Sequence, residues 1–70
     1  MMKFYINKNT DSNPNHDHEV HCENCLWLPN EANREYLGEF DNCIDAIQVA
    51  KTKYSRVDGC MHCCPQCHNH

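Results

Sequence analysis

The cysteine-rich tail carries the strongest structural signal in the sequence, and it reads Cys60-Met61-His62-Cys63-Cys64-Pro65-Gln66-Cys67-His68. Two C-x-x-C units abut within it, and a third candidate unit, Cys22-Glu23-Asn24-Cys25, follows His21. Two residues between cysteines let the chain turn so that both sulfurs reach one metal ion at about 2.3 Å. The pattern therefore predicts a metal site that joins the tail to the upstream unit.

The composition makes such a staple necessary. The chain has 70 residues, of which seven are cysteine and six are histidine, whereas only 40% are hydrophobic even with the cysteines included. A domain this short buries too little apolar surface to offset a conformational entropy cost on the order of 1.5 kcal/mol per ordered residue. We therefore expect a single domain over residues 1–70, held together by metal or by disulfides.

Cysteine usage favours metal over disulfides. The sequence has no apolar run near the roughly 20 residues of a membrane span, and residues 1–6 lack the apolar region of a signal peptide. The expectation is a cytoplasmic, reducing location without membrane contact, where dense cysteine patterns bind metal more often than they form disulfides. An odd count of seven cysteines also fits poorly with complete pairing.

The remaining segments predict a small α+β domain stapled by zinc, with two or three short strands, one helix and a cysteine-rich C-terminal knuckle. Apolar and polar residues alternate at 3–7, which indicates a strand, and shorter strands are expected at 19–22 and 36–40. Turn-forming residues dominate 8–17, which we interpret as a polar loop. These elements would hold the two ligand segments together.

The helix is expected to run from about residue 42 to Tyr54. Asp41 or Asn42 can cap its first turn, and Asp45 follows Asn42 at the capping-box position. The segment Val57-Asp58-Gly59 is interpreted as the turn that closes the helix. Cys43 lies on the apolar stripe of this helix, where we expect a buried, inert thiol.

Four-coordinate zinc needs two upstream ligands and two from the tail. For the upstream pair we prefer His21 with Cys25 to Cys22 with Cys25, because His21 and Cys22 point to opposite sides of an extended segment. The tail candidates are Cys60, Cys63, Cys64 and Cys67. The unit Cys64-Pro65-Gln66-Cys67 is the best of these, because its proline presets the turn. One zinc ion is favoured, and two ions that divide the tail thiols are the alternative.

Metal binding and folding should be coupled. The expected core is small and consists of Phe4, Trp27, Leu28, Leu37, Phe40 and Ile47. Structural zinc contributes about 10 to 16 kcal/mol of apparent binding free energy, more than this core supplies. The metal-free chain should therefore be largely unfolded. Among the other histidines, His68 is either an extra ligand or a hydrogen-bonding neighbour of the site, and His16 and His18 are expected to be solvated.

The order of features from His21 onward resembles the Ada-type zinc domain, a module that removes methyl groups from DNA phosphotriesters. The resemblance rests on three features: His21-x-x-x-Cys25, the stretch from Tyr36 to Phe40 that leads into a helix, and a turn led by Gly59 into a C-x-x-C pair. The whole chain also resembles short, uncharacterised bacterial cysteine-rich proteins with the same tail. The first resemblance implies the fold and the zinc ion, and the second implies a stand-alone protein.

The repair reaction of the Ada-type domain does not carry over. In that family a zinc-bound thiolate accepts the methyl group, and this chain has His21 at the corresponding position. An imidazole cannot replace that thiolate, so the activity would survive only if Cys22 took the role. The basic residues that flank the second pair in the family are also missing, since Pro65 and Gln66 stand there.

The leading functional hypothesis is a non-catalytic zinc module that binds a protein partner. The sequence contains no carboxylate pair, nucleophile-base arrangement or phosphate-cradling loop. One alternative is zinc-thiolate alkyl transfer or redox sensing through Cys22 or Cys43. Another is nucleic-acid binding through Lys51, Lys53 and Arg56, which the net charge of −4 disfavours.

Overall fold

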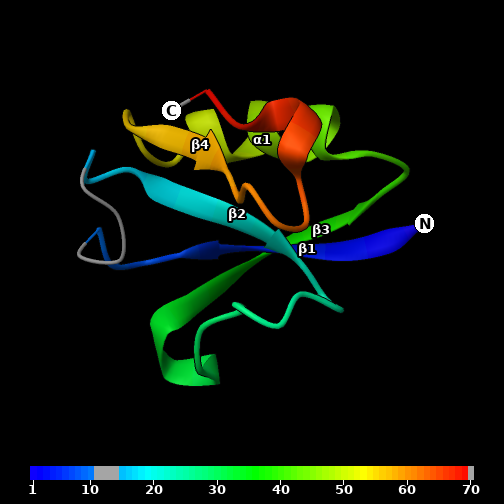
Figure 1. Ribbon diagram of the computed structural model, residues 1–70, viewed down its shortest axis with the longest axis horizontal. Helices are drawn as coiled ribbons and strands as arrows, with labels where there is room; N and C mark the ends of the chain where they lie inside the picture. Colours follow the sequence, from blue (N-terminus) through cyan, green and yellow to red (C-terminus); the bar gives the residue numbers. More distant parts are fainter. Residues whose placement is uncertain (11–14, 70) are drawn as a thin grey trace.

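The computed structural model describes residues 1–10 and 15–69, in which four strands form one mixed sheet and a helix lies across one of its faces (Figure 1). The elements are β1 (Met2–Asn7), β2 (His18–Cys22), β3 (Arg34–Phe40), α1 (Cys43–Lys51) and β4 (Val57–Gly59), with 3-10 turns η1 (Glu31–Asn33) and η2 (Pro65–Cys67). The predicted α+β class with one helix is confirmed for the described residues. The sheet has four strands rather than two or three.

The sheet order is β3-β1-β2-β4, with β1 antiparallel to both of its neighbours and β4 parallel to β2. The prediction that Val57-Asp58-Gly59 is a turn is therefore wrong. Asp and Gly have low strand propensity, but pairing with β2 overrides it, because Val20 lies opposite Gly59 and the next amide, of Cys60, donates to the Val20 carbonyl at 3.0 Å. This edge strand delivers the tail to the end of β2.

The core lies between the sheet and α1. Alternate residues of β1 and β2 meet the buried face of the helix in one cluster, which consists of Phe4, Ile6, Val20, Cys22, Leu37, Cys43, Ala46, Ala50 and Cys64. Phe4 and Leu37 are buried as predicted, and Phe40 and Ile47 pack against the cluster. The expectation of a buried Trp27 is wrong, because its side chain is 61% exposed and lies outside this cluster.

The helix begins as its cap predicts and ends early. The Asn42 side chain accepts a hydrogen bond from the Asp45 amide at 3.1 Å, so the first turn is capped as expected. The helix then ends at Lys51 instead of near Tyr54. Tyr54 leaves the helix and stacks on His18, with ring centroids 4.0 Å apart, which ties the end of α1 to the start of β2.

The predicted polar loop at 8–17 is only partly described, since residues 11–14 lie outside the described part. Residues 8–10 and 15–17 contain no strand or helix, as expected. Asp17 is nevertheless buried, and the Arg56 guanidinium lies 3.6 Å from its carboxylate. Within the described residues, the one helix is too short and too polar to cross a membrane.

Candidate metal centre

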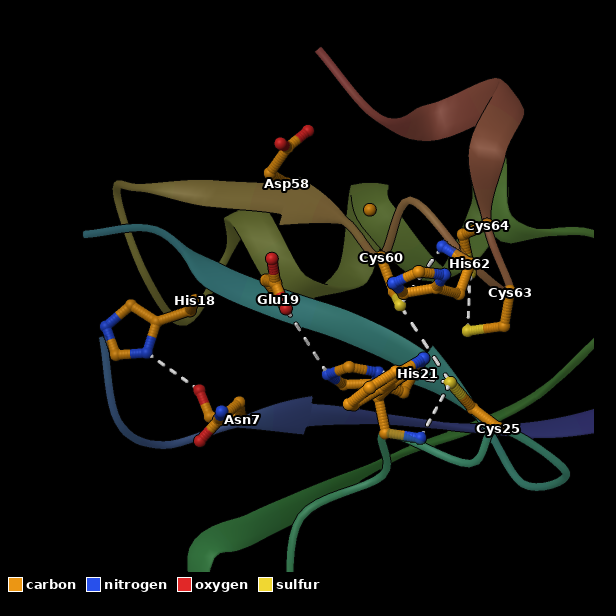
Figure 2. Close-up of polar contacts among 12 residues, drawn as sticks. Asn7, His18, Glu19, His21, Cys25, Asp58, Cys60, His62, Cys63 and Cys64 are labelled. Carbon is orange, nitrogen blue, oxygen red and sulfur yellow. Dashed lines mark hydrogen bonds and ion pairs between the residues drawn. The ribbon is translucent and has the colours of Figure 1, made fainter. Parts of the chain in front are cut away.

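Four side chains converge at the end of β2: His21, Cys25, Cys60 and Cys63 (Figure 2). Their donor atoms all lie within 4.8 Å of one another. Cys25 Sγ is 3.6 Å from His21 Nδ1 and 3.9 Å from Cys60 Sγ. Tetrahedral bonds of zinc-like length put two sulfurs about 3.8 Å apart, and a sulfur and a nitrogen about 3.6 Å apart. The cluster therefore has the dimensions of a four-coordinate metal site, and the predicted metal centre has a location.

The backbone builds this cluster from two tight turns and one strand pairing. The first turn follows β2, where the Cys25 amide donates to the Cys22 carbonyl at 3.1 Å. The second turn follows β4, where the Cys64 amide donates to the Cys60 carbonyl at 2.8 Å and brings Cys63 round to the first turn. The parallel pairing of β4 with β2 sets the two turns side by side (Figure 1). Residues far apart in the sequence thus meet through secondary structure.

Each of the three thiol sulfurs accepts a hydrogen bond from a backbone amide. The Trp27 amide donates to Cys25 Sγ at 3.4 Å, and the His62 amide donates to Cys60 Sγ at the same distance. The Cys22 amide donates to Cys63 Sγ at 3.3 Å. Hydrogen bonds to the charged form favour a thiolate, which is the form that binds metal. The turns therefore do more than set the spacing of the sulfurs.

The fourth donor, His21, is fixed in orientation. Its side chain is 2% exposed, and this burial lowers its pKa to about 4, so the imidazole is neutral and can offer a lone pair. Nδ1 faces Cys25 Sγ, whereas Nε2 makes no hydrogen bond within the described residues and lies 3.7 Å from a Glu19 carboxylate oxygen. Metal-binding histidines commonly turn their second nitrogen toward a carboxylate in this way.

Burial also acts on the cysteines. It raises the pKa of the Cys25 and Cys63 thiols, mainly because a charged sulfur is poorly solvated there. A bound cation reverses this preference, because a coordinating thiol is deprotonated outright. The site is thus suited to hold thiolates only together with a positive ion.

The second C-x-x-C unit, which was predicted to supply metal ligands, does not join the four-residue cluster. Cys64 is 1% exposed and belongs to the hydrophobic cluster, although its sulfur lies 3.7 Å from Cys63 Sγ. Cys67, predicted as a ligand, forms a disulfide with Cys43 and so presents no thiolate in this structure. Cys43 is buried as expected, but it is bonded rather than a free thiol. Pro65 begins η2, which turns Cys67 toward α1.

His62 and His68, the described histidines of the tail, lie outside the four-residue cluster. His68 Nδ1 is 3.0 Å from the Gly59 carbonyl and 3.2 Å from the Asp58 carboxylate, so it braces β4 rather than the donors. His62 stacks on Trp27, with ring centroids 5.0 Å apart, and links the two turns. Sequence reasoning missed the position of Glu19, although strand alternation puts it on the same face as His21.

Comparisons with protein-family models, with curated proteins and with solved structures found no significant match to this chain. The candidate metal centre therefore rests on its own geometry: four donors, three of them sulfur, that lie within 4.8 Å of one another.

Proposed function

We propose that the chain is a zinc module whose ion at His21, Cys25, Cys60 and Cys63 holds the fold together, and that it acts in a reducing cytoplasm as a protein-interaction domain without catalysis of its own. The observation that carries the proposal is the set of four donors within 4.8 Å of one another. Three thiolates and one neutral imidazole suit zinc, which binds cysteine and histidine tetrahedrally.

The donor set supports a structural rather than a catalytic ion. Catalytic zinc sites keep one position open for water or substrate, whereas four protein donors close the coordination shell. Here two donors, His21 and Cys60, are buried, and Cys25 and Cys63 are half-buried. The ion would join the turn after β2 to the turn after β4, and so close the chain around β3 and α1.

The surface beside the centre supports a protein partner. Leu26 and Trp27 follow one ligand, Met61 follows another, and their exposed fractions are 95%, 61% and 58%. Tryptophan and methionine are enriched at protein interfaces, and large exposed apolar side chains in one area commonly mark contact sites. The ion would hold this apolar surface in one shape by fixing both turns that carry it.

The basic residues give less support to a nucleic-acid partner. Lys53 lies 2.9 Å from the Glu35 carboxylate, and Arg56 lies 3.6 Å from Asp17. Two of the three basic residues of that hypothesis are therefore paired within the fold, Lys51 being the third, and the net charge of the chain is −4. A phosphate backbone needs cations that are not already paired.

The test compares two histidine variants by metal content and circular dichroism. His21→Gln removes a donor, so the protein should bind no zinc at the centre and lose its ordered structure. His16→Gln is the matched control, because His16 is exposed and outside the cluster, and it should retain both zinc and fold. Equal zinc content in the two variants would refute the proposed ligand set.

The partner proposal needs a separate measurement on the zinc-loaded protein. Trp27→Ala should weaken binding to a crosslinked cellular partner while zinc content stays constant. Ile44→Ala is the control, since Ile44 is a comparably exposed apolar residue on α1, away from the centre. Equal binding by both variants would contradict the proposal that the surface near the metal binds the partner.

A further inference from the structure

The four cysteines that the candidate centre does not use gather on the helix side of β2. Cys22 comes from the end of β2, Cys43 from the start of α1, and Cys64 and Cys67 from the second C-x-x-C unit. Cys22, Cys43 and Cys64 belong to the buried cluster under the helix, and Cys67 packs against it. We refer to these four residues as the inner cysteines.

The inner cysteines adjoin the candidate centre at two places in the chain. His21 and Cys22 are neighbours in β2, so their side chains leave opposite faces of the sheet, and one enters the centre while the other enters the core. The amide of Cys22 still donates to Cys63 Sγ at 3.3 Å. The second adjacent pair stays close together: Cys63 joins the centre and Cys64 joins the core cluster, with their sulfurs 3.7 Å apart.

The centre and the inner cysteines together account for every cysteine of the chain and for His21. Seven cysteines and His21 supply eight donors, and the centre takes four of them. The other four are all cysteines, and they come from three segments that pack in or against one hydrophobic cluster. Cys64 and Cys67 have the two-residue spacing of a zinc ligand pair, and the disulfide uses only one of them.

We propose that reduction of the Cys43–Cys67 disulfide opens a second metal site, in which Cys22, Cys43, Cys64 and Cys67 bind one zinc ion. The second site goes beyond the proposed function, because it has its own ligands and a different trigger. In the oxidised chain, η2 is fixed to α1 by the disulfide, and in the reduced chain it is fixed there by zinc.

The chemistry balances with a thiol reductant. The reductant supplies two electrons and two protons, the S–S bond breaks, two S–H bonds form, and the reductant becomes a disulfide. Zinc then replaces the four thiol protons, which pass to solvent, and four Zn–S bonds form. The inner cysteines are the only described cysteines outside the centre, so a protein with both ions would have no free thiol.

Native mass spectrometry of the full chain in zinc, with and without a thiol reductant, tests this proposal. The reduced protein should carry two zinc ions, and the oxidised protein should carry one ion and a mass deficit of two hydrogens. A single ion in the reduced protein would overturn the second site and leave the proposed function intact. Absence of zinc in both states would overturn both.

Matched variants separate the two sites. Reduced Cys43→Ser should lose one ion and keep the ion at the centre, whereas reduced Cys25→Ser should lose the ion at the centre. A second ion that persists in Cys43→Ser would overturn the ligand assignment. Alkylation of the reduced, zinc-loaded wild-type protein gives a readout that needs no variant. Peptide mapping should find Cys43 and Cys67 protected until zinc is chelated, and rapid labelling before chelation would contradict the site.

Discussion

The two C-x-x-C units of the tail have the same spacing and abut in the sequence, yet their cysteines have different partners. Cys60 and Cys63 meet His21 and Cys25, whereas Cys64 is in the core and Cys67 is bonded to α1. The first unit is positioned by strand pairing, since the Cys60 amide continues the ladder between β4 and β2. Spacing thus predicts that a unit can bind metal, and the backbone before it decides where it binds.

The largest expected effect is a difference in stability between variants of the two units, measured under oxidising conditions. Cys60→Ser removes a donor from the centre, so the chain should lose most of the about 10 to 16 kcal/mol that structural zinc supplies, and unfold. Cys64→Ser should keep its zinc and lose only about 1–3 kcal/mol through the buried hydroxyl. Zinc content and urea unfolding measure both effects. Zinc loss in Cys64→Ser under these conditions would show that the units are not distinct.

A second, smaller effect should come from Gly59, where β4 meets the second unit. A Cβ at this position would lie 2.7 Å from Cys67 Cβ and 3.0 Å from the Cys64 carbonyl oxygen. Gly59→Ala should therefore destabilise the fold by about 1–3 kcal/mol through overpacking, and slow formation of the Cys43–Cys67 disulfide.

Gly38→Ala is the control for Gly59→Ala. Gly38 has a φ of 130°, so alanine strains the backbone of β3 far along the sheet from the tail. Both variants should unfold at lower urea concentration, but only Gly59→Ala should slow disulfide formation, measured by timed alkylation. The same oxidation rate in both variants would contradict the close packing of Gly59 against the second unit.

Glu19 offers a test confined to the first unit. Glu19→Gln removes the carboxylate that lies 3.7 Å from His21 Nε2, so zinc affinity at the centre should fall about 10–100-fold. Glu39→Gln, on the exposed part of β3, should leave the affinity unchanged. Competition with a chromophoric chelator measures both, and equal affinities would mean that Glu19 does not orient the imidazole.

The smallest effect is expected at the exposed aromatic pair beside the first unit. Trp27→Ala removes the stack with His62, which should cost about 0.5–1.5 kcal/mol and leave zinc content unchanged. Urea unfolding of the zinc-loaded variant checks the cost. A larger loss would mean that Trp27 supports the core, as the sequence first suggested.

Local signals in the sequence predicted several elements well. The cap formed by Asn42 and Asp45, the strand at β1 and the α+β class all follow from short-range patterns. The strand β4 was missed because Asp58 and Gly59 favour turns, and only their pairing with β2 makes them a strand.

The sequence predicted a site of cysteine and histidine ligands, but it did not predict which tail cysteines would form it. Strand alternation predicted that only one of His21 and Cys22 could face the metal, and the structure brings the preferred His21 together with Cys25, Cys60 and Cys63. The division of the tail thiols did not follow, because two abutting units of equal spacing look alike until β4 and η2 direct them. Trp27 was misjudged for a different reason: tryptophan in a short chain usually contributes to the core.

The separation of the donors along the chain has a consequence for protein synthesis. Cys25 and Cys60 are 35 residues apart, with β3, α1 and β4 between them. During translation, His21 and Cys25 therefore leave the ribosome long before Cys60 and Cys63, as half of a site with only two donors. The centre can close only after the helix has been made, so a shortage of free zinc would leave the newborn chain with its helix formed and its two ligand turns not yet joined.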